Sequence, residues 1–298
     1  MTQNLEEQHE TGKMRTSFYD GTIKGMARDT YKFKQAVSIV KTSAWKNYFW
    51  REDPDTLTGS DTNTGKGIPR GAAFPHATKT FQRVISVIEK YGLEDNIAWE
   101  DLISDDVDVR DRTLLGIAEG VAKLVDDEIW SKLTGGAAAD RALTPECQTI
   151  TIAWPNSWEG SSAAIIDDLL QAKQLIAVKN YPVDNLLAFI NPRDHRSIMT
   201  WLYDKGAQAP AIATDVAKNG YVGTIAGISL IISNSVTASH ALVVVPKRVG
   251  TWKEMIPLTT ITKDDPLKSL TIRCAEVGVT QLTDPNAAVL FYGTLSNF

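Results

Sequence analysis

Cysteine and histidine are both scarce in this chain of 298 residues, which contains two cysteines and four histidines. Two cysteines cannot form a disulfide framework. Cys147 and Cys274 are also not part of any CxxC pair or Cys/His cluster that would indicate structural zinc. We therefore expect two buried thiols in a protein that is made and kept in a reducing cytosol.

Long hydrophobic runs and a strong net charge are also missing. No apolar stretch approaches the roughly 20 residues that a membrane-spanning helix needs, and Met1 is followed by polar, acidic sequence instead of a signal peptide. The net charge of -5 gives no overall attraction to nucleic acid or to an anionic membrane. With 43% hydrophobic residues, the chain can still bury a sizeable core in one elaborated domain or two smaller ones.

Motifs of known active sites are absent from the sequence. The histidines occur in neither HExxH nor any other metal-ligand spacing; they are His9, His76, His195 and His240. Thr64-Gly65-Lys66 lacks the spacing of a phosphate-binding loop, residues 223–227 do not form a dinucleotide fingerprint, and there is no GxSxG elbow. We expect no catalytic, cofactor-binding or metal-binding residues, although missing motifs do not rule out an enzyme with an unfamiliar site.

What the sequence does contain is a strand and a helix with clear boundaries. Residues 186–190 form a short apolar run that is typical of a strand buried on both faces. Asn191 can cap the following helix, Pro192 occupies its first position, and Gly206 can end it. The inward face of this helix is assigned to three residues at helical spacing, Ile198, Met199 and Leu202.

The first half of the chain predicts a long hairpin. Residues 52–80 are rich in Gly, Pro, Ser, Thr, Asp and Asn and carry few large apolar side chains. The flanking segments 45–50 and 81–88 suit strands, and a compact domain seldom contains so long an irregular loop without a use for it. We therefore expect an extended hairpin that projects from the body.

The longest helical signal follows this hairpin. Ser104-Asp105-Asp106 offers a cap with acids in the first turn, and Gly135-Gly136 provides the stop. The apolar stripe between them consists of Leu114, Ala118, Val121, Val125 and Trp130. We expect a strand at 149–154 and then a second helix that opens at Ser161-Ser162.

Strands dominate the last part of the chain. They are predicted at 228–232, 241–245, 252–262, 270–280 and 287–292, with turns at Asp264-Asp265-Pro266 and Asp284-Pro285-Asn286. The alternation of the strand that begins at Leu270 slips near Glu276, which indicates a bulge or a strong twist.

Charge is distributed unevenly along the chain. Residues 13–51 contain nine Lys or Arg against two acids, whereas residues 94–111 contain eight acids opposed only by Arg110. A basic arm and an acidic segment in one chain suit head-to-tail contacts between neighbouring copies. Two other interpretations stay open, namely that both segments are solvated faces or that the basic arm contacts nucleic acid.

The order of these elements resembles one family. Residues 186–245 resemble the A-domain of major capsid proteins of tailed double-stranded DNA viruses, which have the HK97-type fold. The resemblance rests on the order of a strand, an Asn-Pro helix, a glycine-punctuated loop, the strand Gly-Ile-Ser-Leu-Ile-Ile-Ser-Asn-Ser-Val and a closing strand. The long hairpin is similar to that family's E-loop and the long helix to its spine helix. The segments 272–279 and 285–291 resemble its long P-domain strands and its final strand, so the resemblance covers residues 45–291 in the correct order.

The resemblance implies an α+β fold of the HK97 type, with an extended E-loop, a spine helix and long strands in the P-domain, and an inserted α/β A-domain. The division it implies is 1–43 for the N-terminal arm, 44–96 for the E-loop and its flanking strands, 97–160 for the first part of the P-domain, 161–250 for the A-domain, and 251–298 for the long P-domain strands and the C-terminal strand.

The function that the resemblance implies is that of a major capsid protein, a shell protein and not an enzyme. Hexamers and pentamers would form an icosahedral shell around double-stranded DNA, assembled in the host cytoplasm and residing in the virion. The implied partners are other copies of the chain, a separate scaffolding protein, a portal and a decoration protein, with no membrane. Lys66 or Lys79 could correspond to the cross-linking lysine of some members.

Two rival hypotheses remain at this stage. One is an encapsulin-like nanocompartment of the same fold that encloses protein cargo. The other is a cytosolic α/β enzyme with an unrecognised site within residues 186–248.

Overall fold

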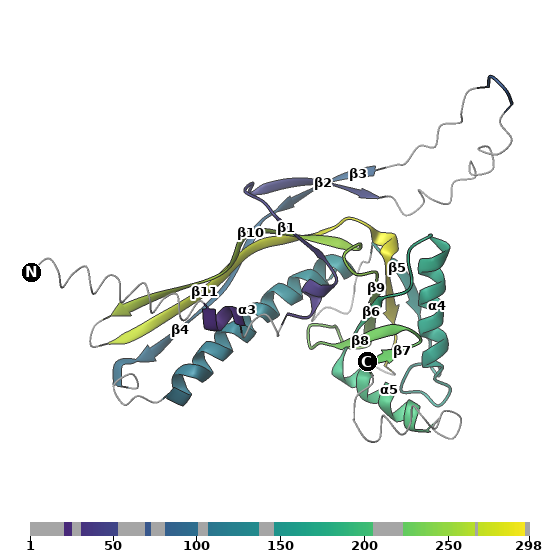
Figure 1. Cartoon of the computed structure of the whole chain (residues 1–298). Coiled ribbons are helices and arrows are strands. Elements are labelled where there is room, and N and C mark those ends of the chain that lie inside the picture. Colours follow the sequence, from purple (N-terminus) through teal and green to yellow (C-terminus); the bar gives the residue numbers. More distant parts are fainter. Residues whose placement is uncertain are drawn as a thin grey trace, which may run out of the picture.

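The computed structural model describes residues 21–25, 31–52, 69–72, 81–100, 107–136, 146–204, 223–265 and 268–295. Two halves and a projecting ribbon are visible (Figure 1). The elongated half consists of a long helix beneath a sheet of long strands, and the compact half consists of a second sheet with two helices. One continuous cluster of buried apolar side chains joins the two halves.

The elongated half contains a four-stranded sheet in the order β1-β10-β11-β4. Its strands are β1 (Ser38–Lys41), β10 (Gly250–Asp265), β11 (Ser269–Leu282) and β4 (Glu89–Ala98). The β10, β11 and β4 strands are antiparallel, whereas β1 pairs with β10 in parallel. The predicted strand at 252–262 is thus longer at both ends, and β1 is a strand that the sequence pattern did not reveal.

The long helix α3 (Val107–Thr134) packs against β4 and β11. All five residues of its predicted apolar stripe are buried, and Gly135 follows it in the left-handed region with φ 77°, as a glycine stop requires. Gly120 allows a close approach to the sheet, because the space that a Cβ would need there is filled by Leu93 of β4. The predicted cap at 104–106 lies outside the described residues.

The long hairpin of β10 and β11 is bent at Glu276. Glu254 pairs with Gly278 and Ile256 with Val277, and a second shift in register follows before Thr259 pairs with Ala275. The irregularity predicted near Glu276 is therefore confirmed, but the extra residues lie in the partner strand β10. Such bulges increase the twist of a strand pair and bend it.

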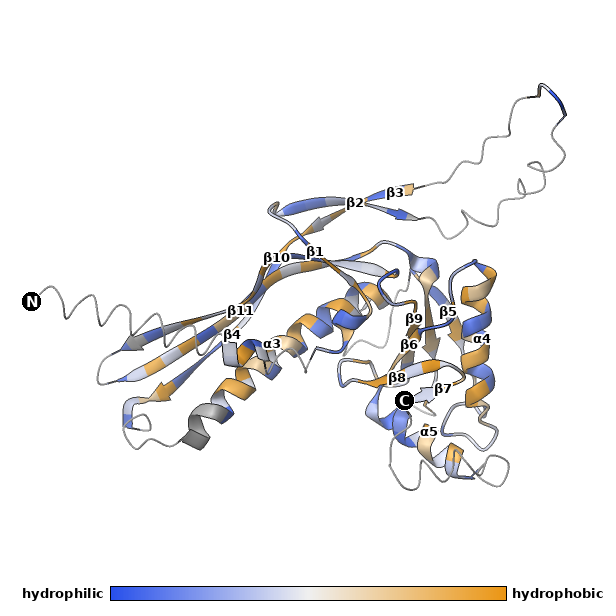
Figure 2. Ribbon diagram, in the orientation of Figure 1, coloured by the Kyte–Doolittle hydropathy of each residue, from blue (hydrophilic) through white to orange (hydrophobic). Residues whose placement is uncertain are grey.

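The compact half contains a six-stranded sheet in the order β5-β12-β9-β6-β8-β7. Its strands are β5 (Gln148–Thr151), β12 (Ala288–Tyr292), β9 (His240–Val244), β6 (Leu186–Ile190), β8 (Ile228–Ile232) and β7 (Thr224–Ile225). The central strands are continuous apolar runs, coloured orange in Figure 2, because both of their faces are covered. The predicted strand at 149–154 is shorter than expected and ends at Thr151.

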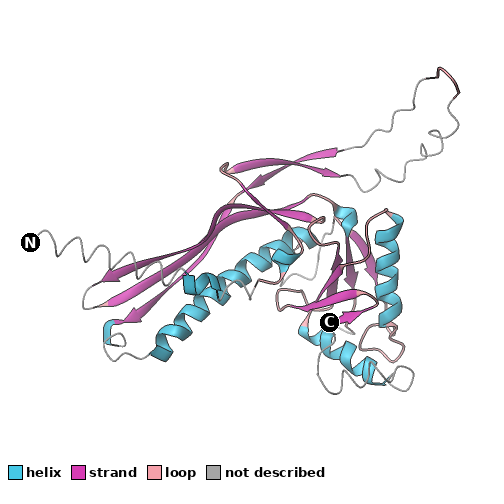
Figure 3. Cartoon of the chain, in the orientation of Figure 1, coloured by secondary structure: helices cyan, strands magenta, loops and turns pink. Residues whose placement is uncertain are grey.

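Two helices complete the compact half (Figure 3), α4 (Ile165–Val178) and α5 (Pro192–Asp204). The capping prediction for α5 is confirmed, because the Asn191 side chain accepts a hydrogen bond from the Arg193 N–H at 3.0 Å. The prediction that α4 opens at Ser161-Ser162 was wrong. The two serines form a turn that precedes the helix, and Ala164 is the N-cap. No side chain forms a cap hydrogen bond there.

The six-stranded sheet combines distant parts of the chain. β5 and β12, which the predicted division assigned to the P-domain, lie in the same sheet as β6, β8 and β9. The division into domains itself stays a prediction. Within the described residues, no helix is long and apolar enough to cross a membrane.

Candidate assembly interface

Two antiparallel strands, β2 (Lys46–Glu52) and β3 (Phe81–Val87), form a ribbon that projects above the long-strand sheet (Figure 1). They are the arms of the hairpin predicted from the sequence, whose connecting residues lie largely outside the described part of the chain. In the register of the ribbon, Tyr48 lies opposite Ile85 and Trp50 opposite Arg83. Side chains alternate between the two faces of such a ribbon.

The inner face of the ribbon is attached to the body. The Gln281 side chain of β11 donates to the Ser86 hydroxyl at 2.6 Å, and this contact is buried. Next to it, Ile88 packs against Val277 and Val279 in a small separate apolar cluster. Arg51 forms an ion pair with Glu146, just before β5. The position of the ribbon relative to the body is therefore set by contacts within one chain.

The outer face of the ribbon is apolar and exposed. Tyr48, Trp50 and Ile85 are 57%, 61% and 58% exposed, and the Arg83 guanidinium lies 4.0 Å from the centre of the Tyr48 ring. We call the exposed apolar side chains of this outer face the ribbon face; they are Tyr48, Trp50, Phe81, Ile85 and Val87. A contiguous group of large exposed apolar side chains is typical of a protein–protein interface.

Charged residues of the predicted basic and acidic segments are partly paired within the chain. Lys34 forms an ion pair with the buried Glu276 at 2.7 Å, and Arg273 forms one with Glu94. The two segments do not pair with each other in these contacts. Whether they meet between copies of the chain stays a prediction. Lys66 and Lys79 lie outside the described residues.

Residues that could support chemistry are not brought together. In the parts of the chain that the structure describes, no group of three or more His, Cys, Asp or Glu could hold a metal ion. His195 lies in α5, where burial lowers its pKa, and His240 is buried in β9. His9 and His76 fall outside the described residues.

The two thiols have the environment expected from the sequence. Cys147 and Cys274 are free and buried. Burial raises the pKa of Cys147 to about 12, which keeps the thiol protonated and unreactive.

A comparison with known families decides what kind of protein carries this interface. A family model described as "Phage capsid protein" matches residues 82–290. The chain belongs to that family. This capsid protein is therefore a structural component of a phage virion capsid and not an enzyme. No curated protein matches its sequence.

Solved structures similar to this capsid protein show its fold. They include the capsid of Cyanophage P-SCSP1u, with 14% identity, 89% of each chain covered and a TM-score of 0.64. The mature capsid of bacteriophage PhiM1 has 16% identity over 90% of this chain and 88% of that chain, with a TM-score of 0.60. A virus-like particle from Pyrococcus furiosus has 10% identity over 93% and 99%, with a TM-score of 0.59. The fold is the HK97-type α+β fold.

The capsid protein contains buried carboxylates that sequence reasoning missed. Asp126 of α3 accepts backbone N–H bonds from Lys32 at 2.8 Å and Phe33 at 3.1 Å. Burial nevertheless raises the pKa of Asp126 to about 7. In α5, burial raises the pKa of Asp194 to about 7, and neither of its carboxylate oxygens has a hydrogen-bond partner among the described residues. An acidic residue at the third position after the Asn191 cap was the sequence signal for Asp194.

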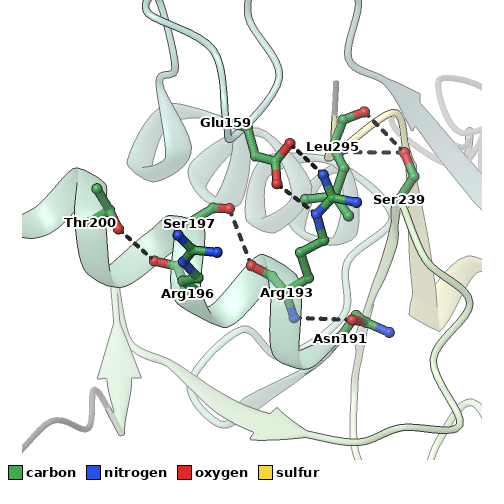
Figure 4. A network of polar contacts seen from close by, with 8 residues as sticks. All are labelled: Glu159, Asn191, Arg193, Arg196, Ser197, Thr200, Ser239 and Leu295. Atoms are coloured by element: carbon green, nitrogen blue, oxygen red, sulfur yellow. Dashed lines mark hydrogen bonds and ion pairs between the residues drawn. The ribbon is translucent and has the colours of Figure 1, made fainter. Parts of the chain in front are cut away.

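A polar network holds α5 against its surroundings (Figure 4). Arg193 forms a bidentate ion pair with Glu159, at 2.8 and 3.2 Å, which joins the first turn of α5 to the segment before α4. On the neighbouring turn, the Ser239 hydroxyl exchanges hydrogen bonds with the backbone of Leu295. The capsid protein thus presents a compact half joined by polar contacts and a ribbon with an exposed apolar face.

Proposed function

We propose that this capsid protein assembles into hexamers and pentamers that close an icosahedral shell around double-stranded DNA. The observation that carries the proposal is the ribbon face. Its inner side is fixed by Ser86 and Arg51 to the same chain, while Tyr48, Trp50 and Ile85 on its outer side are more than half exposed. An isolated two-stranded ribbon is marginally stable in water. A neighbouring copy that covers the ribbon face would stabilise both the ribbon and the contact.

The proposal assigns a role to each part of the fold. The ribbon and the residues it connects act as the E-loop, which extends over an adjacent subunit. The elongated half acts as the P-domain, and the compact half acts as the A-domain that gathers around the local symmetry axis of each capsomer. These assignments follow the division 1–43, 44–96, 97–160, 161–250 and 251–298, with β5 and β12 packing into the sheet of the compact half.

The ribbon face can be tested with a triple variant, Tyr48→Ser, Trp50→Ser and Ile85→Ser. All three side chains are mostly exposed in the single chain, so we expect a folded subunit with an unchanged circular dichroism spectrum and a loss of assembly in sedimentation velocity. Lys46→Ser on the same ribbon and Lys90→Ser on β4 serve as polar controls and should assemble normally. Normal particles from the triple variant would remove the ribbon face from the interface.

Further partners are part of this proposal. We propose that a separate scaffolding protein guides closure and that a portal occupies one vertex. A decoration protein is a third partner, and its binding would appear as extra density on the outer surface of the shell.

A second candidate is an encapsulin-like nanocompartment that encloses protein cargo. It would use the same fold and the same contacts between copies as the genome shell. The contents of purified particles separate the two functions. Nuclease-protected double-stranded DNA supports the genome shell, whereas particles that contain one co-purifying protein and no DNA support the nanocompartment.

A further inference from the structure

The segment from Tyr31 to Lys41, which we call the clasp, lies where the two halves of the subunit meet. Its polar side chains converge on Glu276, whose side chain is completely buried. Lys34 Nζ donates to both carboxylate oxygens at 2.7 and 2.8 Å, and the Tyr31 hydroxyl donates at 2.6 Å. Trp252 Nε1 of β10 donates at 3.1 Å. The carboxylate thus has a cation and two neutral donors, which is what a buried charge requires.

The clasp also contacts the long helix and the compact half. The backbone N–H groups of Lys32 and Phe33 donate to Asp126 of α3. The Phe33 ring stacks on Phe189 of β6, with centroids 4.2 Å apart, and meets the edge of Trp130 of α3 at 5.8 Å. One side chain therefore bridges the helix of the elongated half and the sheet of the compact half.

The connection between the halves is held as well. β9 of the compact half leads into β10 of the elongated half through Lys247, whose N–H donates to the Ala36 carbonyl at 2.7 Å. The Ser38 hydroxyl donates back to the Lys247 carbonyl at 2.8 Å. Lys247 itself has φ 61°, a conformation that a lysine rarely adopts without surrounding support.

Glu276 connects these contacts to the bend of the long β10–β11 hairpin. The register shifts of the long hairpin lie between Glu254 and Thr259 of β10, opposite Glu276. A bulge disrupts the regular hydrogen bonds of the ladder locally and bends the strand pair. The clasp therefore contacts the hairpin at the point where its pairing is irregular.

We propose that the clasp is a releasable lock that fixes both the bend of the β10–β11 hairpin and the angle between the two halves. Release requires Lys34 and Tyr31 to leave Glu276 together, because departure of the lysine alone would leave a buried carboxylate without its cation. Packed interfaces of this kind have discrete arrangements and do not deform continuously. A displacement of the N-terminal arm would thereby change the shape of the subunit without any change in the ribbon face.

The test uses unassembled subunits of the full chain, so that its outcome is independent of shell formation. Spin labels attached through Lys263→Cys at the hairpin tip and Gln174→Cys on α4 report the distance between the halves. Hydrogen exchange is followed at the amides of β1, β6 and the bulged part of β10. The two test variants are Lys34→Met and Glu276→Gln. Arg273→Gln, which removes the exposed ion pair with Glu94 on the same sheet, is the matched control.

We expect Lys34→Met to broaden the distance distribution and to accelerate exchange in β1 and at the bulge by about tenfold or more. Glu276→Gln still accepts from Tyr31 and Trp252, so it should shift both readouts in the same direction by a smaller amount, and it carries the test if Lys34→Met fails to fold. Arg273→Gln should match the unmodified chain. Faster exchange of the clasp with an unchanged distance distribution would overturn the proposal, as would unchanged exchange in both variants.

Discussion

Four carboxylates are buried in the described part of this capsid protein, and their surroundings differ; they are Asp126, Asp194, Glu276 and Asp284. Glu276 has an ammonium group, a phenol and an indole. Asp126 has two backbone N–H groups, and Asp284 has the Tyr181 hydroxyl and the Arg248 guanidinium. Neither oxygen of Asp194 has a hydrogen-bond partner among the described residues. Burial raises the pKa of Asp126 and of Asp194 to about 7. The two aspartates therefore bind protons more tightly in the folded protein than in the unfolded chain.

This difference predicts a pH dependence of stability. An unfolded aspartate releases its proton near pH 4, whereas the folded protein retains protons on Asp126 and Asp194 until about pH 7. Stability should therefore fall as pH rises from about 4 to about 7. Asp194→Asn should remove up to about 1.4 kcal/mol per pH unit of that slope. Urea unfolding across this pH range checks the expectation, with Asp167→Asn on the exposed side of α4 as control. An unchanged slope in Asp194→Asn would contradict it.

The helix register of α5 makes a second prediction at this scale. Leu202 is buried at 4% exposure, whereas its neighbour Tyr203 is 67% exposed. Leu202→Ala should therefore create a cavity and lower the free energy of unfolding by roughly 2 to 5 kcal/mol. Tyr203→Ala should change it by less than about 0.5 kcal/mol. Denaturant unfolding of both variants measures the difference, and equal effects would show that the assigned inward face is wrong.

At the scale of elements, the sequence predicted what local patterns determine. The apolar runs, the Asn191 cap, the α3 stripe and the slip near Glu276 correspond to β6, α5, α3 and the bent hairpin. The clasp could not be predicted, because Lys34 and Glu276 are separated by 242 residues and no local pattern links them. The start of α4 was misplaced because two serines in a turn resemble a cap.

Two glycines in the elongated half predict opposite effects of the same substitution. At Gly278 of β11, a Cβ would lie 2.5 Å from the Trp252 ring and 2.8 Å from the Lys253 carbonyl oxygen. Because Glu276 holds that ring in place, Gly278→Ala should cost about 1 to 3 kcal/mol. At exposed Gly116 of α3, a Cβ meets nothing within 4 Å. Gly116→Ala should therefore stabilise by about 0.5 to 1 kcal/mol.

Thermal unfolding of the two alanine variants checks this pair. The melting temperature should fall for Gly278→Ala and rise for Gly116→Ala. A rise for Gly278→Ala would mean that the packing of β11 against Trp252 is not as described, and a fall for Gly116→Ala would mean that the space at Gly116 is not open.

At the scale of the whole molecule, the subunit combines a continuous core with a ribbon whose outer face exposes large apolar side chains. Exposed apolar side chains of this kind do not stabilise a subunit that stays monomeric. A subunit that repeats around symmetry axes can cover each ribbon face with the next copy, and heterologous contacts of that kind close into rings when the rotation allows it. The architecture is therefore explained by assembly and not by a catalytic centre.

Electron cryo-microscopy of the purified full chain tests this account most directly. The account predicts closed icosahedral particles with fivefold and sixfold clusters of the compact half, in which the outer face of each ribbon lies against a neighbouring copy. Tyr48, Trp50 and Ile85 should be covered in the reconstruction. Subunits that remain monomeric at every concentration and salt condition, or closed particles in which the ribbon face stays open to solvent, would contradict it.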